Sequence, residues 1–303
     1  MNKRVRGLAE ALLVTVLWSS SYVLTKIGLK EVTPLLLVSL RYTVASVILL
    51  TLALTRGEHR RLDAVTLRRM LVLGVTGYTV AQGLQCVGLF YLPAVTVTFI
   101  LNFTPVFVLL LNLVLLAKYP NRTQLAGTGL ILAGSFLFFG GSVGAGSLTG
   151  IAVTVASGVG WGLYLILGAR WLRDSALSPL GVTAFTMGLG TGFIVLTALL
   201  IEGYQPVPAS GWVVILWLGV VNTAAAFFLW NDALRKVEAF EVAVLQNTML
   251  IQIALLSVVF LGEQLTPRKI AGMLLVFTGV LVAQARTKKS VGEETTLPYD
   301  APD

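Results

Sequence analysis

Charged residues are scarce in this sequence. Only 12% of its 303 residues are Asp, Glu, Lys or Arg, whereas soluble domains carry about 25%. This composition argues against a water-soluble fold. The 22 basic residues are spread between apolar runs, and they form no cluster of the kind that binds nucleic acid. We therefore expect no nucleic-acid partner.

Groups for catalysis, metal binding and redox chemistry are equally scarce. The single histidine, His59, lies in a basic loop, and the single cysteine, Cys86, lies in an apolar segment where we expect it to pack. One cysteine cannot form an intrachain disulfide. The sequence contains neither a His-Glu-x-x-His pattern nor a Gly-x-x-x-x-Gly-Lys loop, so a metalloenzyme and an ATP-driven pump are unsupported. We expect no enzyme activity, no catalytic residue, no metal and no cofactor.

Apolar runs, in contrast, fill most of the chain. Hydrophobic residues make up 56% of it, and the mean hydropathy is +0.86. A transmembrane helix needs about 20 largely apolar residues, and the strands of a membrane barrel would alternate over about ten. We therefore predict an all-α polytopic membrane protein with ten transmembrane helices, over residues 8–29, 34–54, 69–90, 94–117, 124–140, 150–169, 180–201, 212–232, 241–262 and 269–285.

The basic residues predict how this chain is oriented. Lys and Arg accumulate in cytoplasmic loops, and 17 of the 22 fall on one predicted side, in the two tails and the even-numbered loops. Both termini are therefore expected to be cytoplasmic, in a bacterial inner membrane. The polar and acidic residues 287–303 predict a disordered cytoplasmic tail.

An internal repeat divides the chain. A shift of 145 positions places several features of the first half on the second without a gap, including Pro34 on Pro179 and Asn102 on Asn247. We expect two five-helix repeats, over residues 1–145 and 146–286. Because each contains an odd number of spans, the second must enter the membrane in the opposite orientation, as in many transporters.

Several loose motifs add a family resemblance. They are Trp-Ser-Ser-Ser-Tyr at 18–22, Asn-Phe-Thr-Pro at 102–105 and Gly-Glu-Gln-Leu-Thr at 262–266. With these motifs in order, the chain resembles the EamA-type branch of the drug/metabolite transporter superfamily from Leu8 to Ala285, and within that branch it is most similar to the YddG aromatic amino-acid exporters. The resemblance implies export of small metabolites through a central cavity lined chiefly by the first, third, fourth, sixth, eighth and ninth helices.

Function follows from the repeat and the resemblance together. We expect a secondary, facilitative exporter of amino acids, aromatic and other apolar ones, which works by alternating access around an uncharged cavity. The alternatives are a purine, a sugar derivative or a drug-like cation as substrate, a channel, and a membrane scaffold that transports nothing. Small-residue faces on the fifth and tenth helices would also support a homodimer.

Polar and aromatic residues at mid-helix are the candidates for substrate binding, because polar side chains in a membrane must face protein or water. Tyr78, Gln82 and Gln85 would share one face of a regular helix. Aromatic rings would stack on the apolar body of the substrate and amides would hold its polar groups, although hydrogen bonds between helices explain the same residues. The full set is Trp18, Tyr22, Tyr78, Gln82, Gln85, Asn102, Trp161, Tyr164 and Asn247.

Proline and the few intramembrane charges complete the candidates. Pro105 removes a backbone donor and should free the carbonyl of Leu101, so we expect a kink, which is either a hinge or a fixed bend. Lys26 and Arg41 lie toward the outer ends of their helices. Snorkelling or pairing accounts for both, and attraction of a substrate carboxylate at the outer mouth is the alternative.

Overall fold

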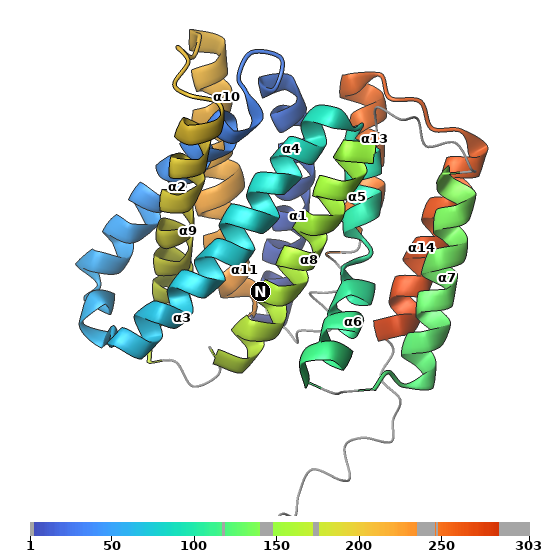
Figure 1. Cartoon of the computed structure of the whole chain (residues 1–303), viewed down its shortest axis with the longest axis horizontal. Coiled ribbons are helices and arrows are strands. Elements are labelled where there is room, and N and C mark those ends of the chain that lie inside the picture. Colours follow the sequence, from blue (N-terminus) through green and yellow to red (C-terminus); the bar gives the residue numbers. More distant parts are fainter. Residues whose placement is uncertain are drawn as a thin grey trace, which may run out of the picture.

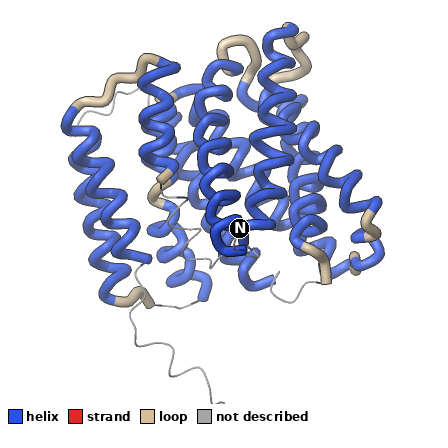
Figure 2. The backbone as a smooth tube through the Cα atoms, turned by 180° about the vertical axis from the view of Figure 1, so that it is seen from behind, coloured by secondary structure: helices blue, strands red, loops and turns tan. Residues whose placement is uncertain are grey.

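The computed structural model of the chain describes residues 3–116, 119–139, 148–171, 176–234, 246 and 248–284. All regular secondary structure in these ranges is helical (Figures 1 and 2). The α-helices are α1 (Lys3–Gly28), α2 (Pro34–Thr55), α3 (Ala64–Gly74), α4 (Gly83–Tyr91), α5 (Ala94–Leu101), α6 (Thr104–Leu116), α7 (Arg122–Phe139), α8 (Leu148–Trp171), α9 (Pro179–Ile201), α10 (Ala209–Gly219), α11 (Ala226–Leu234), α13 (Met249–Leu261) and α14 (Pro267–Gln284). The other helical segments are the 3-10 helix η1 (Glu58–Arg61) and the π-helices η2 (Val75–Gln82) and η4 (Val220–Ala225).

Helices lie over every segment that hydropathy predicts to cross the membrane. Among the described residues, seven helical stretches are long and apolar enough to do so. Three of these combine shorter elements, namely α3 with η2 and α4, α5 with α6, and α10 with η4 and α11. The other predicted segments contain α7 and α14, with 18 residues each, and α13, with 13. Residues 241–245 and the predicted tail 287–303 lie outside the described residues.

Helices α2 and α9 begin alike, at positions 145 residues apart. Their first residues are Pro34 and Pro179, at a position where the missing N–H of proline removes no helical bond. The Glu202 carboxylate accepts two backbone N–H groups of the first turn of α2 at 3.0 Å each. The Glu58 carboxylate accepts the N–H of Ser178, next to α9, at 3.0 Å. These carboxylates satisfy donors that a helix start leaves without partners.

The pair α7 and α14 also follows the repeat. The two helices lie side by side at the edge of the bundle in both views (Figures 1 and 2). A Cβ on Gly127 would lie 2.5 Å from the carbonyl oxygen of Gly279, and a Cβ on Gly134 would lie 2.7 Å from that of Gly272. The helices are therefore antiparallel, and the shift of 145 exchanges one contact for the other. Glycine permits this close approach of two backbones.

Two further features repeat with the same spacing. The hydroxyls of Ser46 in α2 and Thr191 in α9, which are 145 residues apart, hydrogen-bond at 2.9 Å. The π-helices η2 and η4 begin at Val75 and Val220, again 145 residues apart. These contacts relate the two halves by an approximate two-fold axis that passes near Ser46 and Thr191.

Candidate functional site

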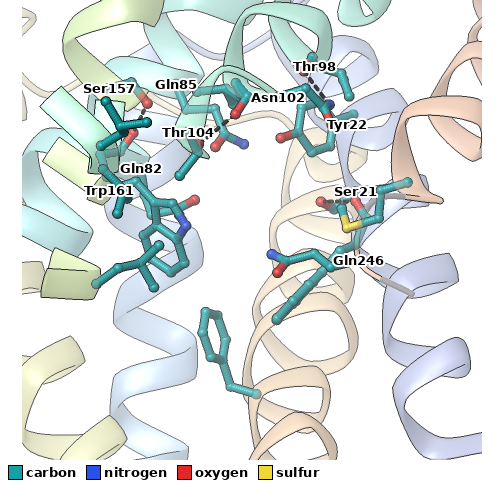
Figure 3. Close-up of a pocket in the computed structure, with 18 of the residues that line it drawn as sticks. Ser21, Tyr22, Gln82, Gln85, Thr98, Asn102, Thr104, Ser157, Trp161 and Gln246 are labelled. Carbon is teal, nitrogen blue, oxygen red and sulfur yellow. Dashed lines mark hydrogen bonds between the residues drawn. The ribbon is translucent and has the colours of Figure 1, made fainter. Parts of the chain in front are cut away.

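A central cavity of about 680 Å³ lies between the two halves (Figure 3). Its walls come from both repeats, with Gln82 and Trp161 on one side of the view and Ser21 and Gln246 on the other. The lining consists of Trp18, Ser21, Tyr22, Arg41, Tyr42, Ala81, Gln82, Gln85, Thr98, Leu101, Asn102, Thr104, Val108, Leu109, Asn112, Gln124, Thr128, Ser157, Trp161, Leu165, Phe227, Gln246, Met249 and Ala283. This volume falls within the range of about 300–1,000 Å³ typical of small-molecule sites.

Six of the nine residues predicted to bind substrate line this cavity: Trp18, Tyr22, Gln82, Gln85, Asn102 and Trp161. Tyr78 and Tyr164 are not part of the lining. Asn247 lies outside the described residues, but its neighbour Gln246 lines the cavity. The predicted binding roles of these residues remain predictions.

Tyr78 belongs to the packed core behind the cavity wall. It is 1% exposed, and its ring contacts those of Tyr42, Tyr164 and Phe227 at centroid distances of 5.7, 6.0 and 6.1 Å. The π-helix η2 explains why Tyr78 leaves the face of Gln85. A π-helix closes i to i+5 bonds and turns less per residue than an α-helix, so the regular spacing assumed from the sequence does not hold there.

The hydroxyl groups of the lining mostly bond to nearby backbone. Ser21 donates to the carbonyl of Trp18 at 2.7 Å, Ser157 to that of Ala81 at 2.6 Å, and Thr98 to that of Ala94 at 2.8 Å. In contrast, the side-chain amides of the half-buried Gln82 and Gln85 have no hydrogen-bond partner among the described residues. Because both amides line the cavity, they are free to bind a ligand or water there.

The break between α5 and α6 places two polar groups in the cavity wall. Asn102 and Phe103 interrupt the helix, and the hydroxyl of Thr104 donates to the carbonyl of Leu101 at 2.6 Å. This is the carbonyl that Pro105 was expected to free, because proline offers it no N–H. A kink was expected here, and the structure has a two-residue break in the helix at this point. A hinge motion there remains a prediction.

Aromatic rings form the apolar part of the walls. The Trp18 ring packs on Phe227 and Trp230 at centroid distances of 5.3 and 4.8 Å. The Trp161 ring stacks on Tyr164 at 4.9 Å with planes 17° apart. Tyr164, which is not part of the lining, therefore packs against Trp161 and holds its indole ring in place at the cavity wall.

Among the described lining residues, Arg41 is the only basic one. The expected uncharged cavity thus has one exception, whereas Lys26 is not among the lining residues. The Nε of Arg41 donates to the hydroxyl of Thr223 in η4 at 2.8 Å, and the guanidinium lies 5.5 Å from the Tyr42 ring centroid. The sequence signal that could identify Arg41 as a site residue is its charge within a predicted membrane span, because charged residues inside membrane helices usually mark functional sites.

The cavity reaches one end of the bundle and is closed toward the other. It extends to Gln124, in the first turn of α7, and to Ala283, in the last turn of α14. At the opposite end the Glu263 carboxylate accepts the N–H groups of Ala94 and Val95 at 2.7 and 3.2 Å. A buried apolar cluster lies beneath this contact, consisting of Tyr22, Leu89, Leu92, Ala94, Val97, Ile100 and Ile253.

Sequence reasoning missed several lining residues on the second, fifth and tenth predicted helices, such as Tyr42, Thr128 and Ala283. These residues have no shared pattern, and only the packing of the halves brings them together. No group of three or more His, Cys, Asp or Glu side chains in the described part of the chain could hold a metal ion.

Comparison with known proteins agrees with this architecture. The model of the EamA-like transporter family matches the chain twice, at residues 5–140 and 148–284. A probable terminal-alkyne amino-acid exporter of Streptantibioticus cattleyicolor is 27% identical over 91% of this chain and 93% of its own length. An S-adenosylmethionine/S-adenosylhomocysteine transporter of Chlamydia trachomatis is 29% identical over 64% of this chain and 62% of its own length.

A solved crystal structure shares the fold, with a TM-score of 0.65 at 20% identity and coverage of 91% of this chain and 96% of the other. The matched family consists of transporters, so the chain is a multi-pass inner-membrane transporter of small metabolites and not an enzyme. Because the family model covers nearly the whole chain in two copies, the chain belongs to the EamA-like transporter family.

Proposed function

We propose that this protein exports amino acids, aromatic and other apolar ones, by alternating access between two inverted five-helix halves. The observation that carries the proposal is the central cavity, which has aromatic walls and free amides and extends toward one end of the bundle, while an apolar cluster is buried at the other. Its volume of about 680 Å³ leaves room for a single amino acid with some water.

The side of the membrane to which the cavity opens follows from the distribution of charge. Arg56, Arg68, Arg69 and Arg122 lie at the end of the bundle toward which the cavity opens, and the positive-inside rule assigns this end to the cytoplasm. With ten spans, both termini lie on that side. The structure then corresponds to an inward-facing state that collects its substrate from the cytoplasm.

The relatives favour substrates that contain an amino-acid group. A terminal-alkyne amino acid and S-adenosylmethionine, the substrates in the names of two relatives, differ in size and charge, but both contain an α-amino acid. We extend this shared chemistry to the present chain.

The gradient of the substrate itself drives the transport that we propose. Proton-coupled carriers use intramembrane Asp, Glu or His as relays. No such residue belongs to the described lining of the cavity. Transport should therefore proceed without an imposed pH gradient.

The test is uptake of labelled Trp, Phe, Tyr, Thr and Met into proteoliposomes that contain the full chain. We expect saturable uptake of at least the aromatic members, without a pH gradient, and lower uptake by the Gln82→Leu variant at equal protein content. Absence of uptake for every amino acid would contradict the proposed substrate class. Flux that rises linearly with concentration would indicate a channel instead.

A further inference from the structure

Arg41 carries a positive charge within the membrane-spanning part of α2. It lies five residues before Ser46, which is near the two-fold axis; this separation corresponds to about 7.5 Å along the helix. A charged side chain at this depth is costly and usually has a partner or a function. No carboxylate of the described residues lies within 4.0 Å of its guanidinium, so the charge has no ion-pair partner there.

The packing of α2 does not require this charge. A shift of 145 residues places Arg41 on Thr186 of the second half and Thr223 on Tyr78 of the first half. The helices that contain Thr186 and Tyr78, α9 and η2, pack against each other as α2 and η4 do. The two halves therefore make the same helix contact, once with a cation and once with neutral groups, and a purely structural role leaves the cation unexplained.

The unused donors of Arg41 are not fully buried, and Arg41 lines the cavity. Its Nε is bound to Thr223, and the two Nη groups have no partner among the described residues, yet neither Nη is among the buried polar atoms without a partner. They therefore remain accessible from the cavity. Arg41 also borders a small recess beside the cavity, which it shares with Tyr42, Gln82 and Gln85.

We propose that Arg41 binds the carboxylate of the transported molecule, so that the protein selects organic carboxylates and rejects compounds that carry only a positive charge. This inference rests on the proposed transport function and names the chemical group that its cavity recognises. The two Nη groups offer paired N–H donors that match the two oxygens of a carboxylate. Gln82 and Gln85 lie beside this point, and their carbonyl oxygens can accept from an α-ammonium group.

The rest of the lining agrees with a zwitterion or an anion as ligand. The described lining contains one cation and no carboxylate, so a bound cation would face repulsion, whereas a carboxylate would meet the opposite charge. Trp18, Trp161 and Phe227 provide the apolar surface for the remainder of the molecule. An aromatic amino acid meets both conditions.

The experiment compares four compounds that share a phenyl ring: L-phenylalanine, 3-phenylpropionate, L-phenylalaninamide and phenethylamine. Binding is measured in detergent from quenching of tryptophan fluorescence, and uptake is measured in proteoliposomes. Wild-type protein should bind the two carboxylates at least 10-fold more tightly than the two amines. Arg41→Gln should weaken carboxylate binding by about 10- to 100-fold, which corresponds to loss of a hydrogen bond to a charged group, and should not weaken binding of L-phenylalaninamide, because the repulsion of its ammonium group is removed.

Two variants separate this role from a general effect on folding. Arg41→Lys keeps the charge without the paired donors and should retain part of the carboxylate preference. Lys30→Gln removes a positive charge from the exposed turn after α1, outside the cavity, and should behave as the wild type. Equal loss of carboxylate and amide binding in Arg41→Gln, or a preference for the carboxylates that survives this substitution, would overturn the proposal.

Failure of the proposed transport function would give a different result from failure of the proposed carboxylate site. Arg41-dependent binding of the carboxylates without uptake of any compound would support the binding site and contradict export. Uptake of the two amines by the wild type, without binding of either carboxylate, would overturn the role of Arg41 and leave a transporter with another substrate class.

Discussion

The Glu263 carboxylate holds the closed end of the cavity, and its removal should open this end more often. Glu263 follows α13 and accepts the first two N–H groups of α5, Ala94 at 2.7 Å and Val95 at 3.2 Å. It therefore joins two helices from different halves. If this contact exists only while the end is closed, the Glu263→Ala variant destabilises the closed arrangement and leaves the open one unchanged.

The expected magnitude follows from the two hydrogen bonds. Loss of a side chain that caps a helix start costs about 1 to 2 kcal/mol, which changes an equilibrium constant by about 5- to 30-fold. The population with an open outer end should increase by this factor. Glu263→Gln keeps one acceptor oxygen and should give a smaller increase, which makes it the matched control.

The assay labels a cysteine placed beneath the contact. Ile100 is 4% exposed and belongs to the apolar cluster at the closed end. An Ile100→Cys substitution in a Cys86→Ser background provides one reactive thiol. Labelling by a membrane-impermeant maleimide from the outside should be about 5- to 30-fold faster with Glu263→Ala than with Glu263.

A second labelling position separates opening from unfolding. Gln124 lies at the open end of the cavity, and a cysteine there should react no faster from the cytoplasmic side when Glu263 is removed. Unchanged labelling at position 100 would refute the reasoning about the closed end. Faster labelling at both positions would show loss of structure and would refute it as well.

Three further predictions concern packing, the cavity wall and a helix start. Gly134→Leu should lower the thermal stability of the detergent-solubilised protein, because a side chain there would meet the backbone of α14 at 2.7 Å, whereas Gly129→Ala, with no atom within 4 Å, should not. Tyr78→Leu should reduce the yield of folded protein, measured by size-exclusion chromatography. Gln82→Leu should keep the wild-type yield and reduce transport, measured by uptake. Wild-type yield and wild-type transport in both variants would contradict both roles. Hydrogen bonds from Thr66 lower the pKa of Asp63 at the start of α3, so its stabilising effect should be present at neutral pH and lost as the pH falls through the folded-state pKa. The melting temperature of the Asp63→Asn variant should lack this loss at acidic pH, and a pH dependence equal to that of the wild type would contradict the stabilising role of Asp63.

The sequence predicts the positions of the helices well because burial in lipid leaves a strong signal. Apolar length predicts ten segments; the described residues of each contain helix, and seven of the helical stretches are long and apolar enough to cross a membrane. The shift of 145 residues also relates contacts within the structure, such as the glycine crossings of α7 and α14, which exchange under it. Duplication preserves spacing, and spacing can be read from one sequence.

The local geometry of the site is less visible in the sequence. The π-helix at Val75–Gln82 places Tyr78 and Gln85 on different faces, and no residue type in this segment indicates a change from α- to π-helical geometry. Arg41 could be identified as a charge in a membrane helix, but its exposure to the cavity depends on how α2 packs against η4. The contact of Glu263 at the closed end joins residues 168 and 169 positions apart, which no local sequence pattern reveals.

Exchange of substrate across the membrane tests the central claim most directly. Proteoliposomes loaded with unlabelled phenylalanine should take up external labelled phenylalanine faster than empty ones, with saturation and without a pH gradient, because a carrier returns faster when its cavity is occupied. Equal rates in loaded and empty vesicles, with flux that does not saturate, would contradict alternating access around this cavity.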